Sequence, residues 1–250
     1  MKFHKLVLEG DKNAEKEQKE SHLPVYTKSD YLRRKRLQSR LPLHSRSFYL
    51  CRMIEEELKG TEIDGSGKIT ICAHQTRYVS GNEKYIHFQD FHVSIYYLKP
   101  EEIVAIEEAD ENIEASVMCE ILRNALLDIA RRNHRPADIT EKIEKAFEHI
   151  INSHFVREER IDKLTKRANH TGLTAHVYRV LSAETGEGWY LKIADRKGSI
   201  YCQETIDGDT RYVDRLGSRL YAKAEWRENT FVILERFGKD IFSITADLYL

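Results

Sequence analysis

The sequence has no long apolar run. Its first twenty residues, MKFHKLVLEGDKNAEKEQKE, offer only residues 6–8 as an apolar run. Such a stretch is too short for the apolar region of a signal peptide. Elsewhere no run approaches the roughly 18 apolar residues that cross a bilayer. We therefore expect an intracellular protein, located in the cytoplasm, with no membrane partner.

Cysteine is scarce and scattered. The four cysteines form no CxxC or CxxxC pair and lie far apart, at Cys51, Cys72, Cys119 and Cys202. A structural zinc site needs clustered ligands, and a disulfide framework needs closely spaced cysteines in a short chain. We expect buried, reduced thiols that pack as small hydrophobic side chains. The sequence predicts neither a metal site nor a cofactor.

Signatures of several common enzyme classes are also missing. The chain contains no GxxxxGK[ST], GxSxG, HExxH or EF-hand pattern. These patterns build a phosphate-binding loop, a nucleophilic serine, a zinc site and a calcium loop. Their absence favours a non-catalytic protein. If the chain is an enzyme, a phosphodiesterase or nuclease is the class that we expect.

Charges of opposite sign are segregated along the chain, although the formal net charge is only −1. Residues 21–52 contain a single acid, Asp30, and eight basic residues. These are Lys28, Arg33, Arg34, Lys35, Arg36, Arg40, Arg46 and Arg52. Residues 101–122 contain eight acids and no lysine or arginine. Like charges held close together repel, so each block requires an opposite partner or open water.

The remaining composition is that of a folded protein. Apolar residues make up 41% of the 250 residues, which is enough buriable surface for a real core. Residues 1–9 are expected to form a short strand. A basic helix is expected over residues 30–40 and is ended by Pro42. A second helix is expected from about residue 45 to 59, with Gly60 placed to terminate it.

The central region combines strands and helices. KITICAHQTRYV and KYIHFQDFHVSIYYL predict two strands joined as a hairpin around residues 80–82. A strongly amphipathic helix is expected over residues 113–133. A D-x-x-E capping box at Asp138 and Glu141 then predicts a helix that continues to about residue 154.

The C-terminal region has a different pattern. Residues 174–250 show short alternating runs such as TAHVYRVLS and EGWYLKIA, with turns at intervals of about 8–12 residues that are typical of a small sandwich or barrel. The predicted fold class is α+β: a helix, hairpin and two-helix unit followed by an antiparallel β domain. The expected domains are a basic N-terminal arm (1–44), an α+β domain (45–160) and the antiparallel β domain (170–250).

The stretch YIHFQDFHVSIYYL, residues 85–98, places histidines among apolar residues. If the predicted hairpin turns near residues 81–82, His74 lies opposite Gln89, and Thr76 lies opposite His87 on the same face. Imidazoles in such a patch can transfer protons or hold a phosphate. The alternative is an ordinary half-buried strand whose polar side chains meet water.

The opposite face of this predicted strand carries Asp90, His92 and Ser94. His92-Val93-Ser94 inside an apolar strand resembles one half of the signature of the two-histidine phosphoesterases. In that family two H-x-[ST] strands face each other across a cleft, and the histidines act as acid and base on a phosphodiester. The resemblance implies phosphodiester hydrolysis as an alternative function. The candidate catalytic residues are thus His74, His87, Asp90, His92 and Ser94.

The basic block offers a different function. Arginine matches phosphate oxygens bidentately, and aromatic side chains such as Tyr31 stack on bases. We expect an interaction protein whose arm contacts nucleic acid, a ribonucleoprotein or an acidic protein surface, within a larger assembly. The arm could instead be solvated or neutralised by residues 101–122. A further alternative is an inhibitor or immunity-type protein whose acidic helix masks a basic surface.

Overall fold

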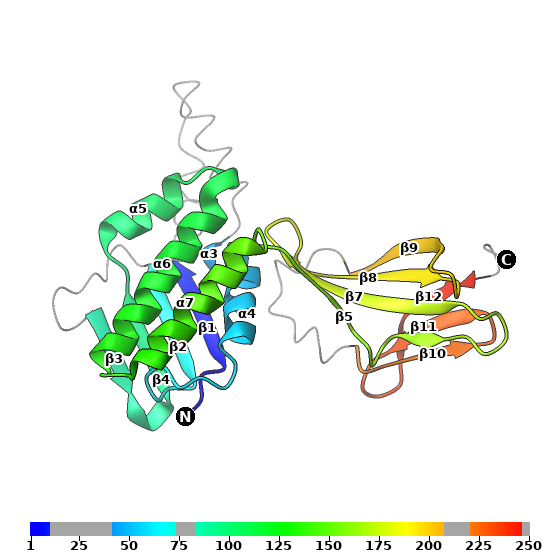
Figure 1. Cartoon of the computed structure of the whole chain (residues 1–250), viewed down its shortest axis with the longest axis horizontal. Coiled ribbons are helices and arrows are strands. Elements are labelled where there is room, and N and C mark those ends of the chain that lie inside the picture. The colour runs from blue at the N-terminus through cyan, green and yellow to red at the C-terminus, as the bar shows by residue number, and fades with distance from the viewer. Residues whose placement is uncertain (11–41, 74–83, 208–220, 247–250) are drawn as a thin grey trace, which may run out of the picture. The chain divides into compact units, whose positions relative to one another are not determined.

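The computed structural model describes residues 1–10, 42–73, 84–207 and 221–246 of the chain. They divide into two compact units, Met1–Phe155 and Val156–Leu250, and each unit is described by itself. The described α-helices belong to the first unit, and the described part of the second unit is built from strands (Figure 1). The predicted α+β class is confirmed.

A mixed sheet forms the centre of the first unit. Its strands are β1 (Lys5–Gly10), β2 (Lys68–Ala73), β3 (Tyr85–Phe88) and β4 (Val93–Tyr97). Their order is β1-β2-β4-β3; β1, β2 and β4 run parallel, and β3 is antiparallel to β4. Residues 69–73 of β2 are all buried, because strands inside a parallel sheet are covered on both faces. The strand predicted at residues 1–9 is present as β1.

Helices pack around this sheet. They are α3 (Leu43–Arg46), α4 (Phe48–Glu57), α5 (Pro100–Glu108), α6 (Glu111–Arg132) and α7 (Ala137–Asn152). α6 and α7 lie across one face of the sheet (Figure 1), and the α6 stripe of Leu122, Leu126 and Ile129 is fully buried, as its helical spacing predicts. Within the described residues, no helix combines the length and apolar character that a membrane crossing requires.

The predicted hairpin between residues 68 and 98 is wrong. β2 pairs with β4, in parallel, and the antiparallel partner of β4 is β3. The stretch 85–98 is not one strand, because a 3-10 turn at Gln89–Phe91 separates β3 from β4. The apolar run of β2 belongs to a strand buried on both faces, which is typical of a parallel sheet rather than of a half-exposed hairpin.

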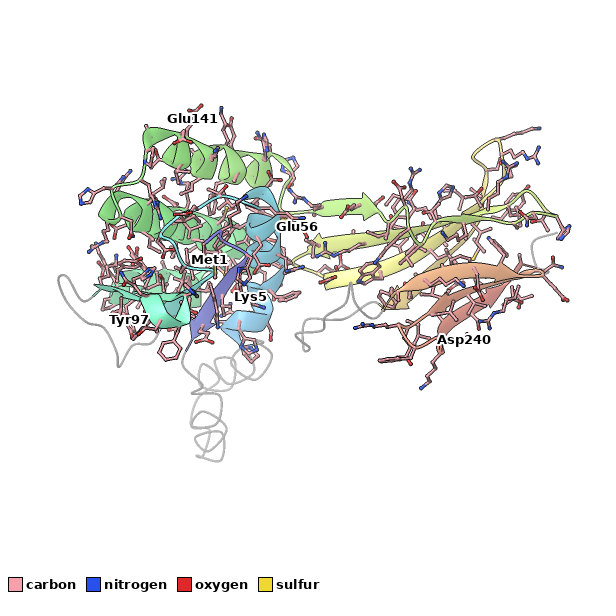
Figure 2. The ribbon with its side chains drawn as sticks, turned by 90° about the horizontal axis from the view of Figure 1, so that it is seen from below. Met1, Lys5, Glu56, Tyr97, Glu141 and Asp240 are labelled. Carbon is pink, nitrogen blue, oxygen red and sulfur yellow. The ribbon has the colours of Figure 1, made fainter. Side chains whose placement is uncertain are left out.

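The predicted capping box of the last helix is also wrong. α7 begins at Ala137 with Pro136 at its N-cap and without a side-chain cap. Asp138 therefore lies inside the first turn, where its carboxylate pairs with Lys142 at 3.4 Å. Glu141 is directed away from the sheet (Figure 2) and pairs with Lys145 at 2.7 Å. A proline favours the first positions of a helix, and here it replaces the carboxylate as the start signal.

The second unit consists of antiparallel strands in two sheets. One sheet contains β5 (Arg157–Arg160), β6 (Lys166–Arg167), β7 (Thr174–Ser182), β8 (Gly186–Ala194) and β9 (Ile200–Asp207). The other contains β10 (Lys223–Arg227), β11 (Thr230–Leu234) and β12 (Asp240–Thr245). Val177 and Leu191 of the first sheet share one core with Phe231 and Ile233 of the second. The predicted C-terminal antiparallel β region is therefore confirmed.

A buried carboxylate protects one edge of the first unit's sheet. β1 is an edge strand, and its Leu6 backbone N–H donates to Glu55 Oε1 of α4 at 2.8 Å. The other oxygen, Oε2, lies 2.5 Å from Arg52 Nη1. Burial raises the pKa of Glu55, and the two donors partly offset the cost of placing a charge there. Glu55 thus satisfies an edge N–H that would otherwise be open to another strand.

We predict that Glu55→Ala lowers the free energy of unfolding by about 2 kcal/mol, because the Leu6 N–H and the Arg52 guanidinium both lose their acceptor. Glu55→Gln keeps an acceptor for Leu6 and should cost less than half as much. Urea denaturation measures both values, with the exposed Glu120→Ala as control. Equal stability of Glu55→Ala and the wild type would contradict this role.

Candidate functional site

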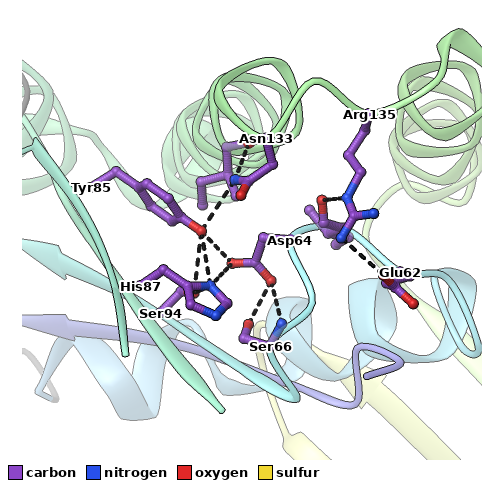
Figure 3. A network of polar contacts seen from close by, with 10 residues as sticks. Glu62, Asp64, Ser66, Tyr85, His87, Ser94, Asn133 and Arg135 are labelled. Carbon is purple, nitrogen blue, oxygen red and sulfur yellow. Dashed lines mark hydrogen bonds and ion pairs between the residues drawn. The ribbon is translucent and has the colours of Figure 1, made fainter. Parts of the chain in front are cut away.

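A network of polar side chains lies at one end of the sheet of the first unit (Figure 3). Its centre is Asp64, in the loop between α4 and β2, whose side chain is 0% exposed. Asp64 Oδ1 accepts hydrogen bonds from the Ser66 backbone N–H at 2.9 Å and from Ser66 Oγ at 2.6 Å. Asp64 Oδ2 accepts a hydrogen bond from the Tyr85 hydroxyl at 2.9 Å.

Strand pairing brings His87 into the same network. His87 of β3 is the register partner of Ser94 of β4, so both side chains lie on one face of the sheet. His87 Nδ1 lies 3.1 Å from Ser94 Oγ, 3.3 Å from the Tyr85 hydroxyl and 3.9 Å from Asp64 Oδ2. Three oxygen atoms thus surround one ring nitrogen and fix the orientation of the imidazole.

Residues at the end of α6 attach this network to the helices. Asn133 Nδ2 donates to the Tyr85 hydroxyl at 3.2 Å and to the Ile129 carbonyl at 2.8 Å. Arg135 Nε donates to the Ile63 carbonyl at 2.9 Å, and Arg135 Nη2 pairs with Glu62 at 3.0 Å. The loop before β2 and the β3–β4 hairpin are therefore both attached to the α6–α7 turn.

The accessibility of these groups limits their chemistry. Asp64 and Ser94 are inaccessible, since the Asp64 side chain and the whole of Ser94 are 0% exposed, whereas the His87 side chain is 20% exposed. Ser94 therefore cannot attack a substrate as a nucleophile. Among the described residues, no group of three His, Cys, Asp or Glu side chains could hold a metal ion. The network is best explained as a set of buried hydrogen bonds that joins several elements and includes one accessible imidazole.

The other candidate catalytic residues are not brought together. Asp90 and His92 are exposed in the turn between β3 and β4, and His92 has a left-handed backbone with φ 51°. The alternation that placed Asp90, His92 and Ser94 on one face is therefore interrupted, and that expectation is wrong. His74 and Thr76 lie outside the described residues, so their predicted patch with His87 and Gln89 stays a prediction.

The resemblance to the two-histidine phosphoesterases gains no support from this geometry. Its motif requires the histidine and the hydroxyl on one strand, facing a cleft. Here His92 precedes the first residue of β4, and Ser94 is fully buried against His87. We do not propose hydrolysis through His92 and Ser94.

Two of the eight predicted anion-binding residues are neutralised inside the first unit. Arg46 forms an ion pair with Glu114, and their side chains are only 15% and 16% exposed. Arg52 pairs with the buried Glu55. The other six lie outside the described residues: Lys28, Arg33, Arg34, Lys35, Arg36 and Arg40. For these six, anion binding stays a prediction.

The acid-rich stretch forms an exposed surface on α5 and the first turns of α6. The exposed acids are Glu101, Glu107, Glu108, Asp110, Glu111 and Glu120. Two apolar side chains are exposed among them, Val104 at 43% and Ile113 at 52%.

The central residues of the network were not predicted from the sequence. DGSG at residues 64–67 indicates a turn, and aspartate in a turn often accepts a hydrogen bond from the backbone two residues later. That signal could have identified the Asp64–Ser66 contact. Tyr85 and Asn133 carry no comparable local signal, because they are 21 and 48 residues away from their partners Asp64 and Tyr85.

Comparisons with known proteins do not assign this chain to a family. No family model, no curated protein and no solved structure matches it. The geometry and charge of its own residues are therefore the basis of any functional proposal.

We predict that Tyr85→Phe lowers the free energy of unfolding at neutral pH by about 1–2 kcal/mol, because Asp64 and Asn133 both lose a hydrogen-bond partner. Urea denaturation measures the loss, with Tyr97→Phe as a control on β4. A Tyr85→Phe variant as stable as the wild type would show that the hydroxyl does not connect the network.

The same variant has a characteristic pH dependence. Burial, with the nearby Asp64 carboxylate, raises the pKa of Tyr85 from 10.0 to about 12. Between pH 10 and about 12, Tyr85 keeps its proton in the folded state and has lost it in the unfolded state. The contribution of Tyr85 to the free energy of unfolding therefore falls as pH rises. The stability advantage of the wild type over Tyr85→Phe should therefore shrink from pH 10 to about 12. Denaturation at several alkaline pH values tests this trend.

Proposed function

We propose that the chain is a nucleic-acid-binding protein whose basic segment, residues 28–40, contacts phosphates. The observation that supports the proposal is the distribution of opposite charge. The two described arginines of the basic block, Arg46 and Arg52, are neutralised by Glu114 and Glu55. The segment 28–40 adds six cations and only one acid, Asp30. We propose that an anionic partner meets this excess of positive charge.

Phosphate is the anion that best fits these residue types. Four of the six cations in the segment are arginines, whose planar guanidinium groups bind phosphate oxygens bidentately. Binding of this kind releases condensed counterions from the nucleic acid, so its affinity falls steeply with salt. Contacts of this type position a protein on nucleic acid without reading its sequence. A role within a larger ribonucleoprotein assembly is part of the proposal.

A protein partner with a basic surface is the second candidate. The exposed acids of α5 and α6, together with Val104 and Ile113, favour it. This is the surface that an inhibitor or immunity-type protein would use to mask cationic residues. The same surface could instead neutralise the chain's own basic segment, and the two cases differ in whether nucleic acid binds.

We predict that changing Arg33, Arg34, Lys35 and Arg36 together to Gln weakens nucleic-acid binding and flattens its salt dependence. Removing four phosphate contacts should reduce the slope of log affinity against log salt by roughly 3. Fluorescence anisotropy with labelled single-stranded and duplex oligonucleotides measures both quantities over a series of salt concentrations.

A matched control removes the same charge elsewhere. Lys59, Arg131, Lys142 and Lys145 are exposed in the first unit, and changing all four to Gln should leave the salt slope unchanged. An equal effect of both quadruple variants would reduce the proposal to nonspecific attraction. No detectable binding at low salt would overturn it, and capture of a basic protein through Glu108, Asp110 and Glu111 would then support the second candidate.

A further inference from the structure

The outer face of the β5-β7-β8-β9 sheet carries a group of aromatic and cationic side chains. Along β7 and β8, Ala175, Val177, Leu191 and Ile193 are fully buried in the core. Because side chains alternate along a strand, the residues next to these buried ones on each strand point outward. These are His176, Tyr178, Tyr190 and Lys192, which are half-buried and are called here the aromatic face.

The register places these residues in two cross-strand pairs, Tyr178 with Tyr190 and His176 with Lys192. The two tyrosine rings are stacked, with centroids 5.0 Å apart and an interplanar angle of 12°. Lys192 Nζ lies 4.8 Å from the centroid of Tyr178 and 5.0 Å from that of Tyr190. The result is a stacked aromatic pair with a cation over both rings.

Polar residues continue the aromatic face onto the outer strands. Arg160 of β5 is the register partner of Tyr178, and Thr205 of β9 is the partner of Tyr190. Gln203 of β9 stands opposite Lys192, and all three of these flanking residues are exposed. A row of cationic, aromatic and hydroxyl groups thus crosses four neighbouring strands.

The described contacts place two cations and two acids on this surface. The cations are Arg160, which is the register partner of Tyr178, and Lys192, whose Nζ lies over both tyrosine rings. Glu158 lies 4.0 Å from Lys192 Nζ, and Asp162 Oδ1 accepts a hydrogen bond from Arg160 Nε at 2.9 Å. Burial raises the pKa of Tyr190, and the hydrogen bond that its hydroxyl donates to the Glu158 carboxylate raises this pKa further. Glu158 therefore has two partners, Lys192 and the Tyr190 hydroxyl.

We infer that the aromatic face binds single-stranded nucleic acid by stacking unpaired bases on Tyr178 and Tyr190. Sheets with aromatic residues on their central strands are a common surface for unpaired bases, because every base has a π-face and the strands hold the rings in place. Lys192 and Arg160 are placed for the adjoining phosphates, and Gln203 and Thr205 supply hydrogen-bonding groups for base edges. Bases within a duplex are stacked on each other and do not reach such a surface. This inference rests on the proposed function and specifies its partner as single-stranded.

The test uses the full chain with both tyrosines changed in two ways. Tyr178→Leu with Tyr190→Leu keeps apolar bulk and removes the rings, whereas Tyr178→Phe with Tyr190→Phe keeps the rings and removes the hydroxyls. The control is Phe237→Leu, which changes an aromatic side chain in the second unit that is 88% exposed and lies between β11 and β12. Anisotropy with a labelled oligothymidylate and with a duplex of mixed sequence measures binding.

We expect the Leu pair to weaken single-strand binding by at least about tenfold at fixed salt, because stacking on each ring is lost. The salt slope should stay unchanged, because phosphate contacts elsewhere are intact. The Phe pair and Phe237→Leu should bind as the wild type does, and duplex binding should be the same in all variants. If the Leu pair alters thermal unfolding, Tyr178→Leu alone gives the same comparison.

Failures of the two proposals are distinguishable. Suppose that the Leu pair binds single strands as tightly as the wild type, while the quadruple Gln variant of residues 33–36 loses its salt slope. The aromatic face is then not the base-binding surface, and the proposed function stands. The same conclusion follows if the Leu pair weakens duplex binding equally. If the wild type binds neither probe at low salt, both proposals are overturned.

Discussion

Pairing of charges inside the first unit separates two arginines of the basic block from the cations proposed to bind a partner. Glu114 neutralises Arg46, and Glu55 neutralises Arg52 while it also accepts the Leu6 N–H at the edge of β1. Partly buried ion pairs of this kind are costly to break, because removal of one partner leaves the other charge in a poorly solvated place. The basic block of the sequence therefore has two parts. Its C-terminal arginines stabilise the fold, and the cations of residues 28–40 are the ones proposed to bind nucleic acid.

The Asp64 network connects three parts of the same unit. It joins the loop before β2, the β3–β4 hairpin and the end of α6 through side chains that are mostly inaccessible. A histidine beside a buried aspartate invites a catalytic interpretation. Ser94 is 0% exposed, and His92 lies before the first residue of β4 in a left-handed conformation. Both observations argue against hydrolysis through these two residues. The functional proposals therefore concern two other parts of the chain, the basic segment and the aromatic face.

Sequence reasoning succeeded where a local period determines the structure. The apolar stripe of α6 and the alternation of β7 and β8 each follow from residues that are neighbours in sequence, and the α+β class followed from them. It failed for β2, because a short apolar run does not show whether its neighbours are parallel or antiparallel. It failed at His92, because a left-handed conformation is uncommon in residues other than glycine. The stacking of Tyr178 on Tyr190 depends on strand register, which alternation alone does not supply.

The salt dependence of nucleic-acid affinity for the unmodified chain tests the central claim most directly. If the six cations of residues 28–40 each meet a phosphate of a single strand, log affinity should fall against log salt with a slope of about −4. A slope near zero, or no binding at low salt, would contradict the claim, since the excess positive charge would then be satisfied by this protein itself or by a different kind of partner.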